Sequence, residues 1–228
     1  MSDTNQVRDH RKIAQELDLY ILDERAGQVI IRNQIQKFLQ QKQKKFGFQE
    51  VITPILGSEY LYETSGHLQH YRDYMFPSFG RDNETFRLRP MTCPHHCLIY
   101  RQKPRSYRDL PWRLCENSFL YRYEASGALK ETLLKEALTE LGLNYIVLKG
   151  EAAFYGPKLD LEIEAADGKN ITIATIQLDF VLPLKFNLKY INKRQELITP
   201  VIIHQSPIGT YQRFIALLLE KTDGRLPF

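Results

Sequence analysis

The sequence predicts an α+β domain built on a largely antiparallel β-sheet that is flanked by helices. From 159 to 165 apolar residues alternate with acidic ones, which is the period of a strand with one solvated face. Asp167–Gly168 is a hairpin-turn signal between this run and the apolar run 170–180, and strands joined by such a turn are antiparallel. Leucines at helical spacing in 130–144 add a clear helix. These patterns argue against a doubly wound parallel sheet.

The first third of the chain alternates between helix and strand signals. A short helix is predicted over 9–20, and an amphipathic helix with a Lys/Gln outer face over 29–47. Residues 48–54 read as a strand that ends at its proline. A helix follows over 58–65, with Ser58 as its N-cap.

The later elements follow the same logic. Two short strands around a Gly/Asp/Asn turn are predicted within 74–90. A helix is expected to begin at Cys93, because proline suits the first turn of a helix. Residues 112–126 form an extended, aromatic-rich run, 200–206 a last strand and 210–222 a last helix. The chain shows no internal repeat and no linker, so a single domain spanning 1–228 is predicted.

Composition sets broad limits on function. The chain has 228 residues, 43% hydrophobic and 25% charged, with a net charge of +4. That mild excess of positive charge permits a nucleic-acid partner but does not require one. Three cysteines make an odd count, and no apolar run approaches the roughly 20 residues of a membrane span. We therefore expect a reduced, cytoplasmic protein with no membrane partner.

The segment Cys93–Cys97 contains two cysteines and two adjacent histidines, and three interpretations are open. It could be a metal site, a nucleophile or ordinary packing. Closed zinc sites usually show two ligand pairs, whereas this is one cluster. On a helix, His95 and His96 point about 100 degrees apart, so both could hardly bind one ion. From this segment alone, buried cysteines and surface histidines are favoured. The chain carries no known nucleophile or phosphate-loop signature.

Two arginines give a different signal. Arg122 and Glu124 lie two residues apart and so share one face of an extended strand. A guanidinium and a carboxylate placed together could hold a phosphate and an amine or adenine. Arg213 lies on a mostly apolar helix, where its charge either reaches the surface or points into a pocket. The alternative for each is an ordinary surface or ion-paired residue.

Taken together, the motifs resemble those of the threonyl-tRNA synthetase family, the class II aminoacyl-tRNA synthetases specific for threonine. The resemblance extends from Asp9 to Phe228 and rests on six stretches: "DHRKIAQELDLY", "RPMTCPHHCLIY", "ENSFLYRYEASGAL", "GEAAFYGPKLD", "TIQLDF" and "PVIIHQSPIGTYQRFIALLLE". It implies the catalytic domain of that family, with an antiparallel sheet flanked by helices. It also implies a homodimer that joins threonine to tRNA(Thr) through an ATP-derived adenylate.

The resemblance implies one zinc ion per catalytic site. Cys93 and His204 match two of its ligands, and the third is a histidine in a segment that normally follows the "SGAL" motif. A zinc with three protein ligands keeps open positions. Threonine can fill them with its amino group and hydroxyl, whereas nearly isosteric valine has no hydroxyl to offer.

Further roles around ATP follow from the same resemblance. Arg122 matches the arginine that contacts the α-phosphate and the attacking carboxylate, a task that suits its planar fork. Glu124 matches the acidic residue near adenine, and Arg213 the arginine on the γ-phosphate. Mg²⁺ is expected to bind together with the triphosphate.

The remaining matches concern the amino acid, the tRNA and the dimer. Tyr155, Lys158 and Gln177 match residues that line the amino-acid and adenylate pocket. His67 matches the histidine implicated in activating the terminal ribose of tRNA, and Pro54 the proline at the dimer interface.

The sequence departs from the family pattern in ways that leave a second function open. "SGALK" runs directly into "ETLLKEALTELG", so the segment with the third zinc ligand is missing after Lys130, and the chain stops before an anticodon-binding domain would begin. Either loops of a longer protein are omitted or the protein is truly shortened. The second case predicts a non-catalytic, dimerising synthetase-like module that binds RNA or a protein partner. Another synthetase of the same subclass is disfavoured by the contexts of Cys93 and His204.

Overall fold

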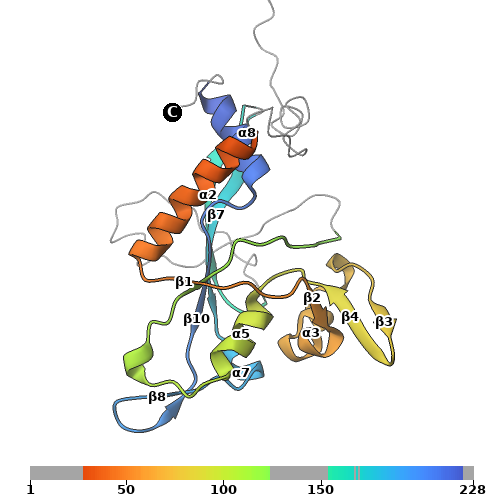
Figure 1. The fold of residues 1–228 in the computed structure, drawn as a ribbon, viewed down its shortest axis with the longest axis vertical. Coiled ribbons are helices and arrows are strands. Elements are labelled where there is room, and N and C mark those ends of the chain that lie inside the picture. The colour runs from red at the N-terminus through yellow and green to blue at the C-terminus, as the bar shows by residue number, and fades with distance from the viewer. Residues whose placement is uncertain (1–27, 124–153, 167, 169, 223–228) are drawn as a thin grey trace, which may run out of the picture. The chain divides into compact units, whose positions relative to one another are not determined.

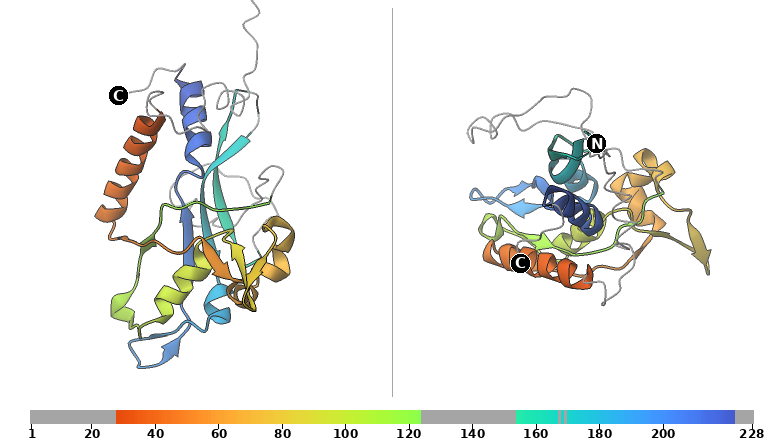
Figure 2. Two further views of the ribbon diagram at one scale, coloured as in Figure 1. Left: turned by 45° about the vertical axis from the view of Figure 1, so that its right-hand side comes forward. Right: turned by 90° about the horizontal axis from the view of Figure 1, so that it is seen from above.

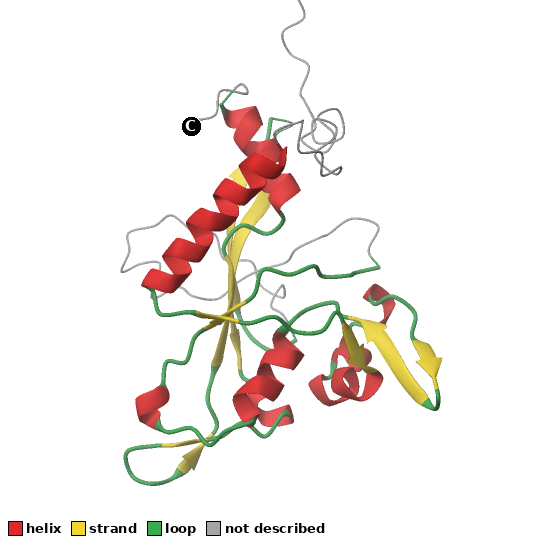
Figure 3. Ribbon diagram, viewed as in Figure 1, coloured by secondary structure: helices red, strands yellow, loops and turns green. Residues whose placement is uncertain are grey.

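The computed structural model describes residues 28–123, 154–166, 168 and 170–222, which form helices and strands together (Figures 1 and 3). The predicted mixed α+β character with antiparallel sheets is confirmed. The predicted helices 9–20 and 130–144 lie outside the described residues.

The chain divides into two compact units. The larger one comprises Gln43–Lys158 and Gln177–His204, and the smaller one the remaining segments, Met1–Lys42, Leu159–Ile176 and Gln205–Phe228. The division passes through the helix α2 (Gln28–Lys45) and through the strands of one sheet.

Three strands of the larger unit form an antiparallel sheet in the order β2-β4-β3. They are β2 (Leu56–Ser58), β3 (Phe79–Arg81) and β4 (Glu84–Leu88). Asp82 and Asn83 join β3 to β4 with φ values of 52° and 67°, the conformation of a tight hairpin turn that Asp and Asn tolerate. The two strands expected within 74–90 are therefore confirmed.

A second pair of strands in this unit is parallel, in addition to the antiparallel pairs that the sequence predicted. β1 (Gln49–Glu50) pairs with β5 (Leu114–Cys115), in the register Gln49 to Leu114 and Glu50 to Cys115. Both strands are shorter than the extended runs expected over 48–54 and 112–126. Beyond β5 the backbone bonds to separate segments. The Tyr121 amide donates to the Arg89 carbonyl, and the Tyr123 amide donates to the Tyr74 carbonyl.

The helices of the larger unit are short. In chain order they are α3 (Glu59–Ser65), α4 (His67–His70), the 3₁₀ turn Arg72–Tyr74, α5 (Cys93–Arg101), the 3₁₀ turn Tyr107–Asp109 and α7 (Leu182–Lys185). The predicted starts at Ser58 and Cys93 are confirmed to within one residue, although the Ser58 side chain makes no capping bond. Gly66 separates α3 from α4 with φ +81°, a conformation that favours glycine.

The core of the larger unit lies among α3, α5 and α7. Leu61, Cys97, Leu182 and Phe186 are each at most 6% exposed and pack in one cluster. Cys93 and Trp112 pack against that cluster while partly exposed. The hydrophobic interior therefore fixes α5, the helix that begins with Cys93.

A three-stranded sheet has the order β10-β7-β6. Its strands are β6 (Lys158–Glu164), β7 (Asn170–Asp179) and β10 (Ile202–Ser206), close to the strands predicted over 159–165, 170–180 and 200–206. A further antiparallel hairpin pairs β8 (Tyr190–Ile191) with β9 (Leu197–Ile198).

In the smaller unit α2 packs on α8 (Tyr211–Lys221) (Figure 2). Ile215 and Ala216 of α8 are buried against Ile31 and Ile35 of α2, the face that the apolar spacing predicted. Within the described residues, no helix combines the length and the apolar character needed to cross a membrane.

The packing of α7 gives a test of the core. Leu182 is 1% exposed and Leu184, two residues later in the same helix, is 64% exposed. We expect Leu182→Ala to lower the free energy of unfolding by about 2–5 kcal/mol, because it leaves a cavity. Leu184→Ala, the control, should change it by less than about 0.5 kcal/mol. Urea denaturation measures both, and equal effects would contradict the packing.

Candidate functional site

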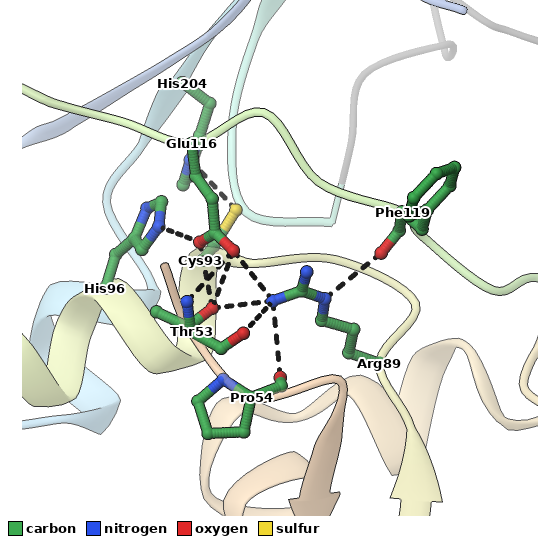
Figure 4. Close-up of polar contacts among 8 residues, drawn as sticks. All are labelled: Thr53, Pro54, Arg89, Cys93, His96, Glu116, Phe119 and His204. Atoms are coloured by element: carbon green, nitrogen blue, oxygen red, sulfur yellow. Dashed lines mark hydrogen bonds and ion pairs between the residues drawn. The ribbon is translucent and has the colours of Figure 1, made fainter. Parts of the chain in front are cut away.

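A buried ion pair organises the polar centre of the larger unit (Figure 4). Arg89 Nη1 lies 2.9 Å from Glu116 Oε1, and the two side chains are 3% and 2% exposed. Arg89 also donates to Thr53 Oγ1 at 2.7 Å, to the Thr53 carbonyl at 2.8 Å and to the Phe119 carbonyl at 3.1 Å. The pair thereby ties the end of β4 to the segments that follow β1 and β5.

His96 of α5 joins this pair. Its Nε2 lies 2.9 Å from Glu116 Oε2, and Thr53 donates to the same carboxylate from its amide and its hydroxyl. Burial alone would raise the pKa of Glu116, but the hydrogen bonds from His96 and Thr53 and the charge of Arg89 hold it below its usual value. Burial lowers the pKa of His96, despite the carboxylate beside it. A neutral imidazole therefore donates to an ionised Glu116.

Cys93 and His204, predicted zinc ligands from distant parts of the chain, lie together (Figure 4). Cys93 Sγ at the start of α5 is 3.2 Å from His204 Nδ1 on β10. A thiolate and an imidazole on one tetrahedral zinc lie roughly 3.5 Å apart, so the pair suits that ion in donor type and spacing. Among the described residues, no third metal-binding side chain joins them.

Asp179 orients His204 and was missed by the sequence analysis. Its Oδ2 accepts from His204 Nε2 at 2.8 Å, while its Oδ1 accepts from the backbone amides of Val181 and Leu182 at the start of α7. The carboxylate is fully buried. Fixing Nε2 in this way turns Nδ1 toward Cys93 Sγ, and carboxylates hold metal-binding histidines by the same kind of bond. An aspartate directly before a Pro-containing helix start was the available signal.

The charge on His204 depends on the same neighbours. Burial would lower its pKa, but Cys93 and the hydrogen bond to Asp179 outweigh burial and raise it to about 10. Zinc takes neutral imidazole and thiolate as ligands, so its binding to this pair would release a proton.

Two of the predicted pocket residues, Tyr155 and Gln177, lie near this pair. The Tyr155 hydroxyl donates to Gln177 Oε1 at 2.7 Å, and the Tyr155 ring packs edge-on against His204 with centroids 5.6 Å apart. Burial raises the pKa of Tyr155, so it remains a neutral hydrogen-bond donor. Lys158 is 3% exposed at the start of β6.

The three residues predicted to bind ATP do not all belong to the same described unit. Arg122 is exposed, donates from Nε to the Pro90 carbonyl at 3.1 Å and lies 5.8 Å from the Tyr71 ring. Within the described residues its terminal nitrogens have no protein acceptor. Arg213 belongs to the smaller unit, in the first turn of α8, where Thr210 caps its amide. Glu124 lies outside the described residues.

His67 is fully buried, which was not expected of a residue that meets tRNA. Its Nδ1 lies 2.7 Å from Ser65 Oγ and its Nε2 2.6 Å from Met91 Sδ, with Phe154 edge-on at 5.7 Å. Burial lowers its pKa to about 4, more than the charge of Asp179 raises it. The ring is thus neutral, as a proton acceptor must be, and its catalytic role stays a prediction.

The expectation that both histidines of the Cys93–Cys97 segment lie on the surface was wrong. His95 is 7% exposed and packs near Tyr62, and His96 is half-buried on Glu116. The helix start faces inward because the Arg89–Glu116 pair and the core both lie beside it. Cys97, at 2% exposure, is a core residue as expected.

Comparison with known proteins places the sequence in context. A family model described as the tRNA synthetase class II core domain (G, H, P, S and T) matches residues 74–135 and 128–222. The two matched stretches meet around the junction at Lys130. A threonine–tRNA ligase of Ureaplasma parvum is 39% identical over 96% of this chain and 52% of its own, and threonine–tRNA ligase 1 of Bacillus subtilis is 36% identical over 96% and 46%. The chain spans about half the length of these curated relatives.

Solved structures of aminoacyl-tRNA synthetases also match the fold of this chain. A crystal structure described as the RNA binding domain of threonyl-tRNA synthetase from Cryptosporidium parvum matches with a TM-score of 0.83 and 30% identity, over 97% of this chain and 74% of that one. Prolyl-tRNA synthetase of Giardia lamblia, in complex with prolyl-adenylate, matches with a TM-score of 0.64 at 17% identity, over 85% and 46%, and shares the fold.

The burial of His67 predicts an acid-sensitive fold. The unfolded chain binds a proton on this histidine near pH 6.5, but the folded protein only near pH 4. Stability is therefore complete above pH 6.5 and falls by up to about 3 kcal/mol as the pH drops toward 4. Urea denaturation across this range should show a smaller loss for His67→Gln than for wild type. The control His70→Gln, at an exposed position, should follow wild type. An unchanged slope in His67→Gln would contradict the assignment.

Proposed function

The chain belongs to the tRNA synthetase class II core family and to its threonyl-tRNA synthetase branch, and from this premise we propose that it is the catalytic part of a threonine–tRNA ligase. In the proposed reaction the threonine carboxylate attacks the α-phosphate of ATP and pyrophosphate leaves. The resulting adenylate then gives its threonyl group to the 3′ end of tRNA(Thr). The approach of Cys93 to His204 is the observation that carries this proposal, because it assembles a zinc-type donor pair where the family pattern requires one.

The amino-acid pocket follows from that pair. When bound, zinc would supply open coordination positions that a substrate with both an amino group and a hydroxyl can fill. Tyr155 and Gln177 stand next to His204 with their polar ends joined, which leaves further lone pairs and amide hydrogens for a polar substrate. An apolar isostere such as valine would leave these groups unsatisfied, and that penalty gives discrimination.

The triphosphate would be held by arginine. Arg122 is anchored through Nε, so its two terminal nitrogens are oriented in advance for two oxygens of the α-phosphate region. Preorganised charge of this kind stabilises the negative charge that builds up as the adenylate forms. Arg213 and Mg²⁺ would neutralise the remaining phosphates.

A homodimer in the cytoplasm completes the proposal. Ile52 is 93% exposed and Ile55 42% exposed, on either side of the segment Thr53–Pro54 that Arg89 holds. Apolar side chains beside a rigid segment favour burial against a partner subunit.

One observation favours the alternative of a non-catalytic synthetase-like module that binds RNA or protein. Within the described residues, Cys93 and His204 have no third protein ligand. Two ligands alone would bind zinc weakly. Metal content and adenylate formation therefore separate the two functions.

We expect the purified protein to contain about one zinc per chain, since catalytic zinc needs the thiolate and imidazole donors. Cys93→Ser should lose most of that zinc. The control is Cys115→Ser, which changes a cysteine of β5 that lies opposite Glu50 of β1. This variant should keep its zinc. Elemental analysis of protein prepared without chelators measures both, and wild-type protein free of zinc would favour the non-catalytic module.

Arg122→Ala tests the ATP side separately. The change should slow threonine-dependent pyrophosphate exchange by about 10²–10³-fold, the usual cost of one preorganised donor. Arg113→Ala changes an exposed arginine whose side chain bonds only to the Pro111 carbonyl among the described residues, and it should retain exchange. Near-normal exchange in Arg122→Ala would refute the assigned role.

A further inference from the structure

The larger unit carries a polar pocket that the proposed reaction does not use. It has a volume of about 340 Å³, within the range of small-ligand sites. Its lining combines two cationic, two amide-bearing, one aromatic and one aliphatic residue: Lys103, Arg105, Gln49, Gln102, Trp112 and Ile99. No acidic residue lines it.

The guanidinium of Arg105 is held between aromatic rings. Its Cζ lies 4.1 Å from the centroid of the Trp112 ring and 5.6 Å from that of Tyr100. Its Nε is buried and has no hydrogen-bond partner among the residues that the structure describes. The backbone on either side is fixed, because the Arg105 carbonyl accepts from the Ile191 amide at 2.9 Å. A donor that is buried, oriented and unsatisfied is costly unless a ligand completes it.

The lining is cationic, and the carboxylate of Asp109 lies within electrostatic range of Arg105. In the described part of the chain, neither Lys103 nor Arg105 forms an ion pair. Asp109, the acidic residue of the same loop, accepts instead from the amide and hydroxyl of Ser106, at 2.7 and 3.1 Å. Arg108 and Lys193 stack on the Tyr107 ring and do not belong to the lining of the pocket. The pocket is therefore a concentrated cationic site.

We propose that this pocket binds a phosphate group. The planar fork of Arg105 suits two oxygens of a tetrahedral oxyanion, and Lys103 supplies a mobile point charge. The side-chain amides of Gln49 and Gln102 add further hydrogen-bond donors. A phosphate has enough oxygens to accept from all of these groups, whereas a carboxylate has only two. The cations exclude a metal ion, and the polar lining disfavours an apolar ligand. The phosphate could come from a small phosphate compound or from an RNA backbone. The inference is independent of the proposed ligase activity.

The chain provides its own probe, because Trp112 is the single tryptophan of the protein. Its indole donates to Gln49 Oε1 at 3.2 Å and stacks on Arg105, so a ligand on the guanidinium changes its environment. Titration of the full chain with inorganic phosphate, at ionic strength held constant with chloride, should give a saturable change in tryptophan emission. Absence of saturation would overturn the proposal.

Three variants locate the binding. Arg105→Gln and Lys103→Gln should each weaken phosphate binding about tenfold or more, as expected for loss of one charged hydrogen bond. Arg108→Gln removes the same charge from the same loop outside the pocket and should bind like wild type. Equal weakening by all three would mean diffuse surface charge and would overturn the proposal, as would unchanged binding in Arg105→Gln. Lys103 is exposed, so its variant decides the matter if Arg105→Gln fails to fold.

A competition experiment identifies the source of the phosphate. Phosphorus NMR of inorganic phosphate in the presence of the protein reports the bound fraction. Release of phosphate by a short RNA duplex, lost in Arg105→Gln, would support the RNA backbone as ligand. Retention of phosphate in excess RNA would support a small phosphate compound.

Discussion

The ion pair between Arg89 and Glu116 is the interaction on which the rest of the candidate site depends. Both side chains are almost completely buried, and removal of two charges from water costs several kcal/mol per ion. The structure offsets that cost with a nearly complete set of hydrogen bonds, from Thr53 and His96 to the carboxylate and from the guanidinium to backbone carbonyls. Loss of either partner alone would leave an uncompensated charge, which typically costs about 3–5 kcal/mol.

The position of Cys93 follows from this pair. The helix α5 begins only four residues after Arg89, and its His96 is bound to Glu116, so the first turn of the helix is fixed from both ends. On the opposite side, Asp179 accepts from the backbone amides at the start of α7 and holds His204 at the same time. Two independent anchors thus bring a thiol and an imidazole to 3.2 Å. Ligands held in this way lose little freedom on binding a metal, and a rigid site can discriminate between substrates of nearly equal shape.

The sequence predicted those helices and strands whose residues show a local periodic pattern or a local start signal. The alternation over 159–165 and the proline after Cys93 correspond to β6 and to the start of α5. The parallel pairing of β1 with β5 could not be predicted, because it joins residues about 65 positions apart through two-residue strands. Arg89 and Glu116 each look like ordinary charged residues until the fold buries them together. The pairing of Cys93 with His204, separated by 111 positions, came from the family resemblance and not from spacing.

The central claim is that Cys93 and His204 hold a metal that recognises threonine. Replacement of zinc by cobalt(II) makes that site visible, because a thiolate ligand gives an absorption band of sulfur-to-metal charge transfer and the weaker cobalt bands report coordination. The account predicts a charge-transfer band that is lost in Cys93→Ser, and cobalt bands that change when threonine is added but not when valine is added. A spectrum without thiolate character, or one that responds equally to threonine and valine, would contradict the account.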